Sequence, residues 1–321
     1  MNDAVSRPHV AGLVLRHLAD GEEDLFASMP DPLPSLPQIS YADGVAGGGY
    51  HPSRTWIALR DGRVVGRAAW LLPPGAVGTP WLERFDLAGS PADGAALLWA
   101  AFTAMGGATA WYASMPAGWR SRPDLVEVLA ASASAAREVG LAERGERLRF
   151  RWTPAPRPES PAAPAPAESR LWVRPAAGAD EIEALVARIP APDLLTGAEV
   201  ARLVAGVDLA RRPLDWLRGG PAPWRIALNG DEPVGLTGPA GDACYPMVAY
   251  LGVLDPAARP ALLADAVATL AAGGALEVVA DVDATNAPVI AELGAAGFVA
   301  VRSRILFAPA AGSRPPTEPH P

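Results

Sequence analysis

The segment from residue 248 to residue 298 constrains the fold of this chain more than any other. An apolar run at 248–253 precedes a stretch whose apolar residues recur at the spacing of one buried helix face: Leu262, Leu263, Ala266, Val267 and Leu270. Gly273 and Gly274 stop that helix. Residues 276–280 are apolar and β-branched, as in a buried parallel strand, and Asn286 is placed to cap a last helix. The order is strand, helix, strand, helix, strand.

Length and composition favour a soluble protein of two domains. The chain has 321 residues, 50% of them hydrophobic, which is enough for substantial buried cores. Its net charge of −8 disfavours nucleic acid and anionic membranes as partners. No apolar run approaches the roughly 20 residues that span a bilayer, and the first residues lack the features of a signal peptide. We therefore expect a cytoplasmic protein.

The inventory of reactive side chains excludes several enzyme classes. Cys244 is the only cysteine, which rules out an intramolecular disulfide and a cysteine-rich zinc site. All 27 basic side chains are arginine, so Schiff-base chemistry, a P-loop lysine and a kinase lysine are excluded. The histidines form no His-Glu-x-x-His pair, and there is no Gly-x-Ser-x-Gly motif. We expect no metal.

A proline- and alanine-rich segment divides the chain. Residues 153–169 contain almost no large apolar side chains, which is typical of a linker, and residues 309–321 have the composition of a disordered tail. We expect one domain on each side of the linker, at residues 11–152 and 170–308.

The two halves repeat one series of elements. Trp-Ile-Ala-Leu59 before Asp61-Gly62 and Arg-Ile-Ala-Leu228 before Asn229-Gly230 each predict a hairpin, and both second strands contain Val-Gly. The remaining strands are predicted at 13–16, 82–87, 108–114, 171–174 and, as a half-buried edge strand, 146–152. Further helices are predicted at 21–29, 95–105, 124–139, 180–189 and around 199–209. We interpret the halves as divergent copies of one α+β fold.

Motifs of the second half carry a resemblance to a known family. They are Tyr250-Leu251-Gly252-Val253, the run Ala-Asp-Val-Asp-Ala-Thr-Asn-Ala-Pro288, and the closing Gly297-Phe298. The chain resembles the GNAT (GCN5-related) N-acetyltransferases, in particular tandem two-domain members of actinobacterial type. The resemblance implies an α+β fold of two tandem GNAT-like domains, each a mixed, mainly antiparallel sheet flanked by helices. It also implies an N-acyltransferase with acetyl-CoA or another acyl-CoA as cosubstrate.

In this family a glycine-rich loop after the central strand binds the pyrophosphate of coenzyme A through backbone N–H groups. The corresponding segment here, residues 254–263, has either lost about one turn of that loop or carries Leu262 at a required glycine. The resemblance implies that Leu251, Val253, Arg259 and Asn286 bind the cofactor. The alternative for Arg259 is a solvated surface position.

The matching loop of the first half contains Gly89 and Gly94, but Asp93 would place negative charge beside a pyrophosphate. The alternative, which we favour, is that Ser90 or Asp93 caps the following helix. The sequence therefore predicts degenerate coenzyme A loops in both copies.

Acyl transfer to an amine needs a base for the ammonium and an acid for the departing thiolate. Glu83 is the first candidate for the base, because it shares a strand face with Phe85 and would be partly desolvated there. Asp86 points to the opposite face. A salt bridge from Glu83 to Arg84 or Arg67 is the structural alternative.

Other candidates come from the second half. The position of the tyrosine that serves as the acid in many family members is occupied by Leu293, so Tyr245 and Cys244 are the substitutes. Asp281 is a second candidate base. With Asp283 it could form a metal pair, although carboxylates beside a helix start more often serve as caps.

The acceptor site is predicted in the glycine-rich segment 43–52, where Tyr50 and His51 are the candidate substrate-binding residues. Loop flexibility alone would also explain the glycines. The expected partner is an amine on a small molecule or peptide, and the oligomeric state is open. The competing hypothesis is a catalytically inactive GNAT-like protein that binds a ligand or another protein.

Overall fold

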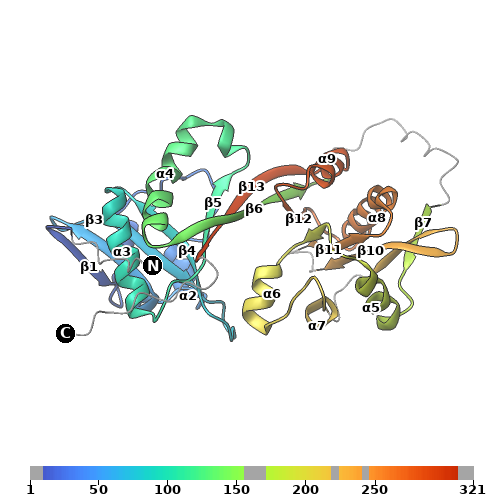
Figure 1. The fold of residues 1–321 in the computed structure, drawn as a ribbon, viewed down its shortest axis with the longest axis horizontal. Coiled ribbons are helices and arrows are strands. Elements are labelled where there is room, and N and C mark those ends of the chain that lie inside the picture. The colour runs from blue at the N-terminus through green and yellow to red at the C-terminus, as the bar shows by residue number, and fades with distance from the viewer. Residues whose placement is uncertain (1–9, 155–170, 218–223, 241–245, 310–321) are drawn as a thin grey trace, which may run out of the picture. The chain divides into compact units, whose positions relative to one another are not determined.

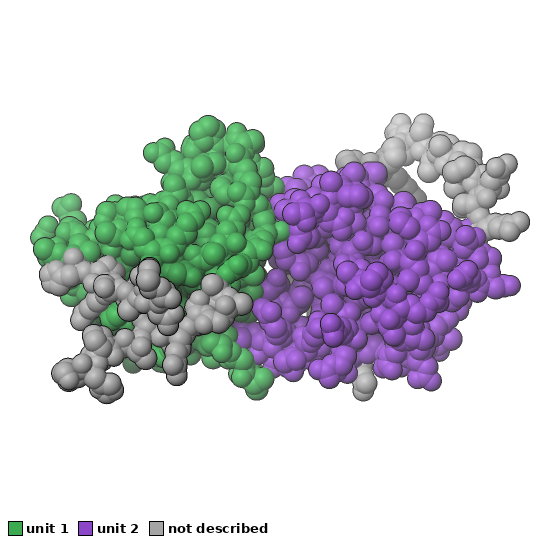
Figure 2. Space-filling model, in the orientation of Figure 1, with its two compact units in different colours: residues 1–146, 303–321 green, residues 147–302 purple. Residues whose placement is uncertain are grey.

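The computed structural model describes residues 10–154, 171–217, 224–240 and 246–309 (Figure 1). The chain forms two compact units, coloured separately in Figure 2: unit 1 is Met1–Glu146 with Ser303–Pro321, and unit 2 is Arg147–Arg302. Most of the predicted linker, nearly all of the predicted tail, and the candidates Cys244 and Tyr245 lie outside the described residues. Within the described ranges, no helix is long and apolar enough to cross a bilayer.

Unit 1 is a mixed sheet with helices on both faces. Its strands lie in the order β1-β2-β3-β4-β5-β13-β6. They are β1 (Leu13–His17), β2 (Thr55–Arg60), β3 (Arg63–Leu71), β4 (Trp81–Leu87) and β5 (Trp111–Pro116), with the first part of β6 (Leu141–Trp152) and the last part of β13 (Val299–Pro309). The helices are α1 (Glu23–Ala27), α2 (Tyr41–Ala46), α3 (Pro91–Ala104) and α4 (Pro123–Glu138), and 3-10 turns occupy Pro52–Arg54 and Trp119–Ser121.

Two apolar clusters sandwich the sheet of unit 1. The larger one joins α3 and α4 to the sheet through buried residues such as Leu98, Phe102 and Leu129. Ile305 and Phe307 of β13 belong to this cluster, and Phe307 stacks on Trp111 with ring centroids 4.7 Å apart. The smaller cluster lies under α1 and α2. Unit 1 therefore completes its core with residues from the far end of the sequence.

Unit 2 repeats the arrangement, with strands in the order β6-β12-β11-β10-β9-β7. Its strands are β7 (Leu171–Pro175), β8 (Leu194–Leu195), β9 (Arg225–Asn229), β10 (Glu232–Ala240), β11 (Met247–Val253) and β12 (Val278–Asp283), with the last part of β6 and the first part of β13. Its helices are α5 (Ala179–Arg188), α6 (Ala198–Ala205), α7 (Leu214–Leu217), α8 (Arg259–Ala272) and α9 (Ala287–Ala295), and a 3-10 turn occupies Pro256–Ala258.

The local predictions hold where side-chain chemistry determines the backbone. Asp61 and Gly62 form the β2–β3 turn with φ of 50° and 76°, the left-handed values of a tight hairpin turn. The predicted face of α8 is buried, including Leu262 and Leu263. Asn286 caps α9 by accepting a hydrogen bond from the Val289 backbone N–H. These outcomes and the mixed sheets confirm the predicted α+β fold.

One prediction about strands was wrong, and a second placed the start of a strand too early, although that strand, β12, is mostly buried and parallel to β11 as expected. Residues 146–152 do not form an edge strand, because β6 lies between β13 and β12. Its residues from Arg147 to Trp152 pair with β12 in antiparallel register. Leu276 precedes β12 and is 79% exposed, so the apolar run begins before the strand does. Alternation alone does not distinguish an edge strand from an inner one.

Candidate functional site

Each unit contains one pair of adjacent parallel strands, which meet at one end and then diverge. In unit 1 the pair is β4 and β5, joined at Leu82 and Trp111. In unit 2 it is β11 and β12, joined at Met247 and Val279. We call the space beyond each junction the wedge: between residues 83–87 and 113–115 in unit 1, and between residues 249–253 and 280–282 in unit 2. Carboxyl ends of parallel strands are common places for ligands.

A β-bulge lies at the start of both wedges. In the β3–β4 pair, Ala69 faces Arg84 and the next residue faces Leu82, so Glu83 is the extra residue. In the β10–β11 pair, Gly238 faces Tyr250 and the next residue faces Val248, which makes Ala249 the extra residue. Bulges re-aim a side chain and often occur beside active sites. Glu83 and Ala249 are therefore equivalent positions, and only unit 1 has a carboxylate there.

Glu83 is held by two donors. Its Oε2 accepts hydrogen bonds from the Trp81 indole N–H at 2.5 Å and from Arg304 at 2.6 Å. The Arg304 guanidinium also lies over the rings of Trp81 and Tyr112. The ion pair is with Arg304 of β13, while Arg67 binds Asp86 at 2.7 Å. Sequence reasoning missed Arg304, because no local pattern links residues 221 positions apart.

A small cavity of about 50 Å³ occupies the wedge of unit 1. Residues from Glu83 to Leu87, four residues of β5 and part of α4 line it, and a segment from Asp31 to Gln38 covers it. Leu33 and Leu36 of that segment are buried in the unit 1 core. For residues 31–38, all of which the structure describes, no backbone hydrogen bond to β4 or β5 is present. Side chains, and not a strand, fill this wedge.

The wedge of unit 2 is closed by main chain. Strand β8 pairs with β11, and the N–H groups of Asp193 and Thr196 donate to the carbonyls of Leu251 and Ala249 at 2.7 and 2.9 Å. The buried Thr196 hydroxyl also donates to the Val248 carbonyl and accepts from the Asp281 N–H. The segment 193–196 thus bonds to both diverging strands. Its short apolar pair gave no sequence signal of a strand.

The turn after the central strand of unit 1 has little capacity for an anion. The N–H groups of Ala88 and Gly89 both donate to the Val65 carbonyl at 2.9 Å. Ser90 and Asp93 form a reciprocal capping box at the start of α3, as we favoured from the sequence. The structure describes all of residues 88–94, and their backbone N–H groups bond within the chain at every position but two: Pro91, which has no N–H, and Ala92, whose N–H has no partner.

Unit 2 repeats this arrangement at the matching positions. Leu254 and Asp255 both donate to the Val234 carbonyl, as Ala88 and Gly89 do to Val65. Asp255 accepts from the Ala257 N–H through its side chain and from the Ala258 N–H through its carbonyl. Apart from the Ala92 N–H, the chain itself bonds to the N–H groups described for both turns, which agrees with the degenerate loops expected from the sequence.

The predicted cofactor residues of unit 2 point into protein. Leu251 is fully buried in the core, and the half-buried Val253 packs against that core. Arg259 is 7% exposed and forms ion pairs with Asp193 at 3.0 Å and Glu292 at 2.8 Å, so the solvated alternative was wrong. Burial alone would lower the pKa of Arg259, but the hydrogen bonds that it donates to Glu292 and Asp193 raise it.

Tyr50 and His51 are adjacent in sequence but differ in environment. Tyr50 is buried, stacks on Tyr41 and has its pKa raised to about 12, first by burial and then by the nearby Glu83 carboxylate. It therefore stays protonated near neutral pH, close to Glu83. His51 is exposed and its Nδ1 bonds to Ser53, where it begins the turn Pro52–Arg54.

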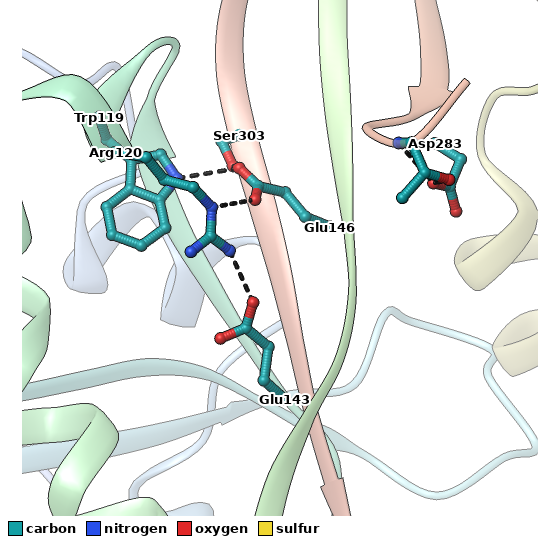
Figure 3. Close-up of polar contacts among 7 residues, drawn as sticks. Trp119, Arg120, Glu143, Glu146, Asp283 and Ser303 are labelled. Carbon is teal, nitrogen blue, oxygen red and sulfur yellow. Dashed lines mark hydrogen bonds and ion pairs between the residues drawn. The ribbon is translucent and has the colours of Figure 1, made fainter. Parts of the chain in front are cut away.

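Asp281 and Asp283 have structural partners. Arg149 grips Asp281 through two hydrogen bonds of 2.8 Å, and Asp281 is 8% exposed. Asp283 accepts from the N–H and hydroxyl of Thr285, and the hydroxyl bond is the first cause that lowers the pKa of Asp283 (Figure 3). Within the described residues, no three histidine, cysteine or carboxylate side chains form a group that could hold a metal.

A polar network in unit 1 joins the 3-10 turn Trp119–Ser121 to β6 and β13 (Figure 3). Glu146 accepts hydrogen bonds from Trp119 at 2.9 Å, Arg120 at 2.7 Å and the buried Ser303 hydroxyl. Burial alone would raise the pKa of Glu146, but these three hydrogen bonds, led by that from Ser303, hold it below its usual value. Arg120 also pairs with Glu143 at 2.6 Å. The network connects β13, the last strand of the sequence, to β6 and to the turn Trp119–Ser121.

Comparison with solved structures supports the fold. No family model and no curated protein matches the chain. A GCN5-related N-acetyltransferase from Sphaerobacter thermophilus aligns with 93% of this chain and 95% of its own, at 16% identity and a TM-score of 0.54. A tandem GNAT protein from the clavulanic acid biosynthesis pathway aligns with 94% and 99%, at 20% identity and a TM-score of 0.44. An acetyltransferase of the GNAT family from Colwellia psychrerythraea aligns with 92% and 100%, at 11% identity and a TM-score of 0.42.

The first of these likenesses extends over nearly the whole of both chains, and its low identity limits what it shows to architecture. The aligned 93% of this chain spans both units described above. The chain therefore has the fold of the GCN5-related N-acetyltransferases.

Proposed function

We propose that this protein is an N-acyltransferase that takes an acyl group, acetyl in the first instance, from coenzyme A to an amine of a small molecule or peptide. The donor enters the wedge of unit 1, and Glu83 is the base. The observation that carries the proposal is the position of Glu83: it is the bulged residue of the central strand and lines the cavity where β4 and β5 diverge. Its counterpart in unit 2 is Ala249.

The chemistry assigned to Glu83 is removal of one proton. The carboxylate takes a proton from the acceptor ammonium, which leaves a neutral amine with a free electron pair. The nitrogen attacks the thioester carbonyl carbon, a C–N bond forms, and the C–S bond breaks. The departing thiolate gains the second proton of the attacking nitrogen, and Glu83 releases its proton to water. The products are an amide and a free thiol.

Turnover with a panel of amines tests the proposal. The full chain is incubated with acetyl-CoA and small amines or lysine-containing peptides, and both free thiol and acylated amine are measured. Since the chain contains no lysine, acetyl-lysine in the reaction can come only from the peptide. Equal amounts of thiol and amide are the expected result. No amide with any amine, together with no binding of acetyl-CoA, would remove the proposal.

A second candidate function, a GNAT-like protein that binds a ligand without catalysis, is favoured by one observation. The segment 31–38 leaves a cavity of only about 50 Å³ in the wedge of unit 1, and β8 closes the wedge of unit 2. Binding of acetyl-CoA without transfer to any amine would support this second function. Thermal unfolding detects such binding, because a ligand specific for the folded state raises the melting temperature.

A further inference from the structure

The turn after β4 places a buried carboxylate where a nucleotide phosphate would approach the helix N-terminus. The Asp93 side chain is 4% exposed and is paired with Arg60 at 2.5 Å. Burial alone would raise the pKa of Asp93, but hydrogen bonds from Ser90 and Arg60 lower it, so the group stays ionised at neutral pH. A phosphate at this helix start would compete with a carboxylate for Arg60, and apart from the Ala92 N–H the backbone donors there are already in use.

The remaining approach to the wedge is along the edge of β4. In unit 2 the residues that flank β8, Asp193 and Thr196, donate their N–H groups to the carbonyls of Leu251 and Ala249. The common register makes Phe85 and Glu83 the residues of unit 1 that correspond to Leu251 and Ala249. A ligand in the same position in unit 1 would have to supply similar donors. An extended ligand that carries amides can add to a strand edge in the same way as a peptide. The pantetheine arm of a thioester donor is an extended chain with two amide groups.

We propose that unit 1 recognises its acyl donor through the pantetheine arm and not through the nucleotide phosphates, an inference that rests on the proposed function. Two observations support it together: the donors after β4 are occupied by Val65, Ser90 and Asp93, and the wedge of unit 1 lacks the strand that unit 2 inserts. The donor class then includes any acyl thioester of pantetheine, whether or not a nucleotide is attached.

The segment 31–38 has to give way to such a donor. Two of its backbone N–H groups bond within the segment itself: that of Leu33 to the Asp31 side chain, and that of Leu36 to the Leu33 carbonyl. The apolar side chains of Leu33 and Leu36 pack into the core of unit 1. A segment with few backbone bonds opens at lower free energy than a paired strand. The apolar part of a pantetheine arm can replace the leucine contacts.

Isothermal titration of the full chain with acetyl-CoA and with S-acetyl-pantetheine tests the inference. We expect dissociation constants that differ by less than about ten-fold, since even one charge-assisted hydrogen bond to a phosphate is worth about that factor or more. A dissociation constant for acetyl-CoA at least about ten-fold lower would overturn the inference and leave the proposed function standing. Binding of neither compound would overturn both.

Substitution of Asp93 gives an independent readout. Asp93→Asn keeps a side-chain oxygen for the Ser90 N–H and removes the negative charge. Affinity for acetyl-CoA should rise several-fold, while affinity for S-acetyl-pantetheine stays the same. The control is Asp124→Asn, which removes an exposed carboxylate from the first turn of α4. Equal effects of the two substitutions, or a fall in affinity for both thioesters in Asp93→Asn, would count against the inference.

Discussion

Unit 1 and unit 2 share a bulge, a parallel strand pair and a closed turn, yet they fill the wedge by different means. Unit 2 inserts β8, which is bonded through its main chain to β11 and through Thr196 to β12. Unit 1 covers its wedge with apolar side chains of the segment 31–38. Hydrogen-bonded main chain is harder to displace than a few apolar contacts. The comparison shows that one copy can keep the space between its parallel strands for a ligand, while the other copy fills the same space with a strand of its own.

The two units also differ in the residue at the bulge, where Glu83 is the proposed base in unit 1. Glu83 and Ala249 occupy the two bulges, and the strand closed by β8 is the one without a carboxylate. Each unit also pairs a buried or half-buried arginine with its central region: Arg304 with Glu83, and Arg259 with Asp193 and Glu292. In unit 1 the pair leaves Glu83 on the cavity wall, whereas in unit 2 it covers the start of α8.

The largest expected effect comes from shortening the chain after Arg302. Unit 1 would lose Ile305 and Phe307, both fully buried, together with one partner of Glu83, Arg304, and one partner of Glu146, Ser303. Burying each such apolar side chain contributes about 1.5–3 kcal/mol, against a total stability of about 5–15 kcal/mol. We expect unit 1 to lose its cooperative unfolding transition in calorimetry. A chain ending at Pro309 is the control, and unchanged unfolding of the shorter chain would contradict the assignment of these residues to unit 1.

Glu83→Gln should lower the rate of amide formation by about 10²-fold or more, since general base catalysis contributes roughly that factor. Asp281→Asn changes a residue beside the closed wedge of unit 2 and should leave the rate within about two-fold of the wild-type rate. Both rates are measured at saturating acetyl-CoA, with circular dichroism to confirm folding. Loss of turnover only in Asp281→Asn would move the active site to unit 2.

Arg259→Ala separates stability from donor binding. It leaves Asp193 and Glu292 without their partner in a largely buried ion-pair cluster, which typically costs about 3 kcal/mol or more of folding free energy. Urea unfolding should show that loss, whereas titration should show an unchanged affinity for acetyl-CoA. A large fall in affinity at constant stability would mean that unit 2 keeps a working phosphate site.

The smallest effect concerns acid stability. The pKa of Glu146 is depressed in the folded protein, so its hydrogen bonds contribute full stability above the ordinary glutamate value of 4.5. That contribution is lost as pH falls through the lower folded value. Glu146→Gln should therefore destabilise unit 1 at neutral pH and flatten the decline of its stability below pH 4.5. The melting temperatures of variant and wild type are measured from neutral to acid pH. If they fall with pH by the same amount, Glu146 does not contribute in this way.

Much of the fold could be predicted from the sequence, because local chemistry determines it. The turn at Asp61 and Gly62, the cap at Asn286 and the apolar face of α8 each depend on residues close together in the chain. The candidate site could be predicted only in part. Glu83 became a candidate because alternation places it on the face of Phe85, and that reason was wrong. The bulge breaks the alternation: Glu83 bonds to Trp81 and Arg304, whereas Phe85 packs on Trp111 in the core under α3 and α4. Both the bulge and the Arg304 contact depend on pairing between distant strands.

The role of β8 could not have been predicted from its two leucines, since its bonds to β11 arise from tertiary pairing. Likewise, the internal bonds that occupy the turns after β4 and β11 depend on the Val65 and Val234 carbonyls of the preceding strands. The sequence showed that glycines were missing from one loop. It did not show which acceptors in the protein bond to the backbone N–H groups that would otherwise face a phosphate.

The linker predicted at residues 153–169 can be tested by proteolysis. Proteolysis should cut first within residues 153–169, as their composition predicts, but the two products should stay together. The reason lies within unit 1, whose core takes Ile305 and Phe307 from the second product. Size-exclusion chromatography of the cut protein measures this. Separation of the products without denaturant would contradict it.

Hydrogen exchange on the full chain, with and without saturating acetyl-CoA, tests most directly where the donor binds. The account predicts protection of peptides that cover residues 31–38 and strand β4, and no change in peptides that cover residues 193–196 and strand β11. Protection confined to the unit 2 peptides would contradict the central claim that unit 1 holds the donor and that unit 2 has closed the same site with β8.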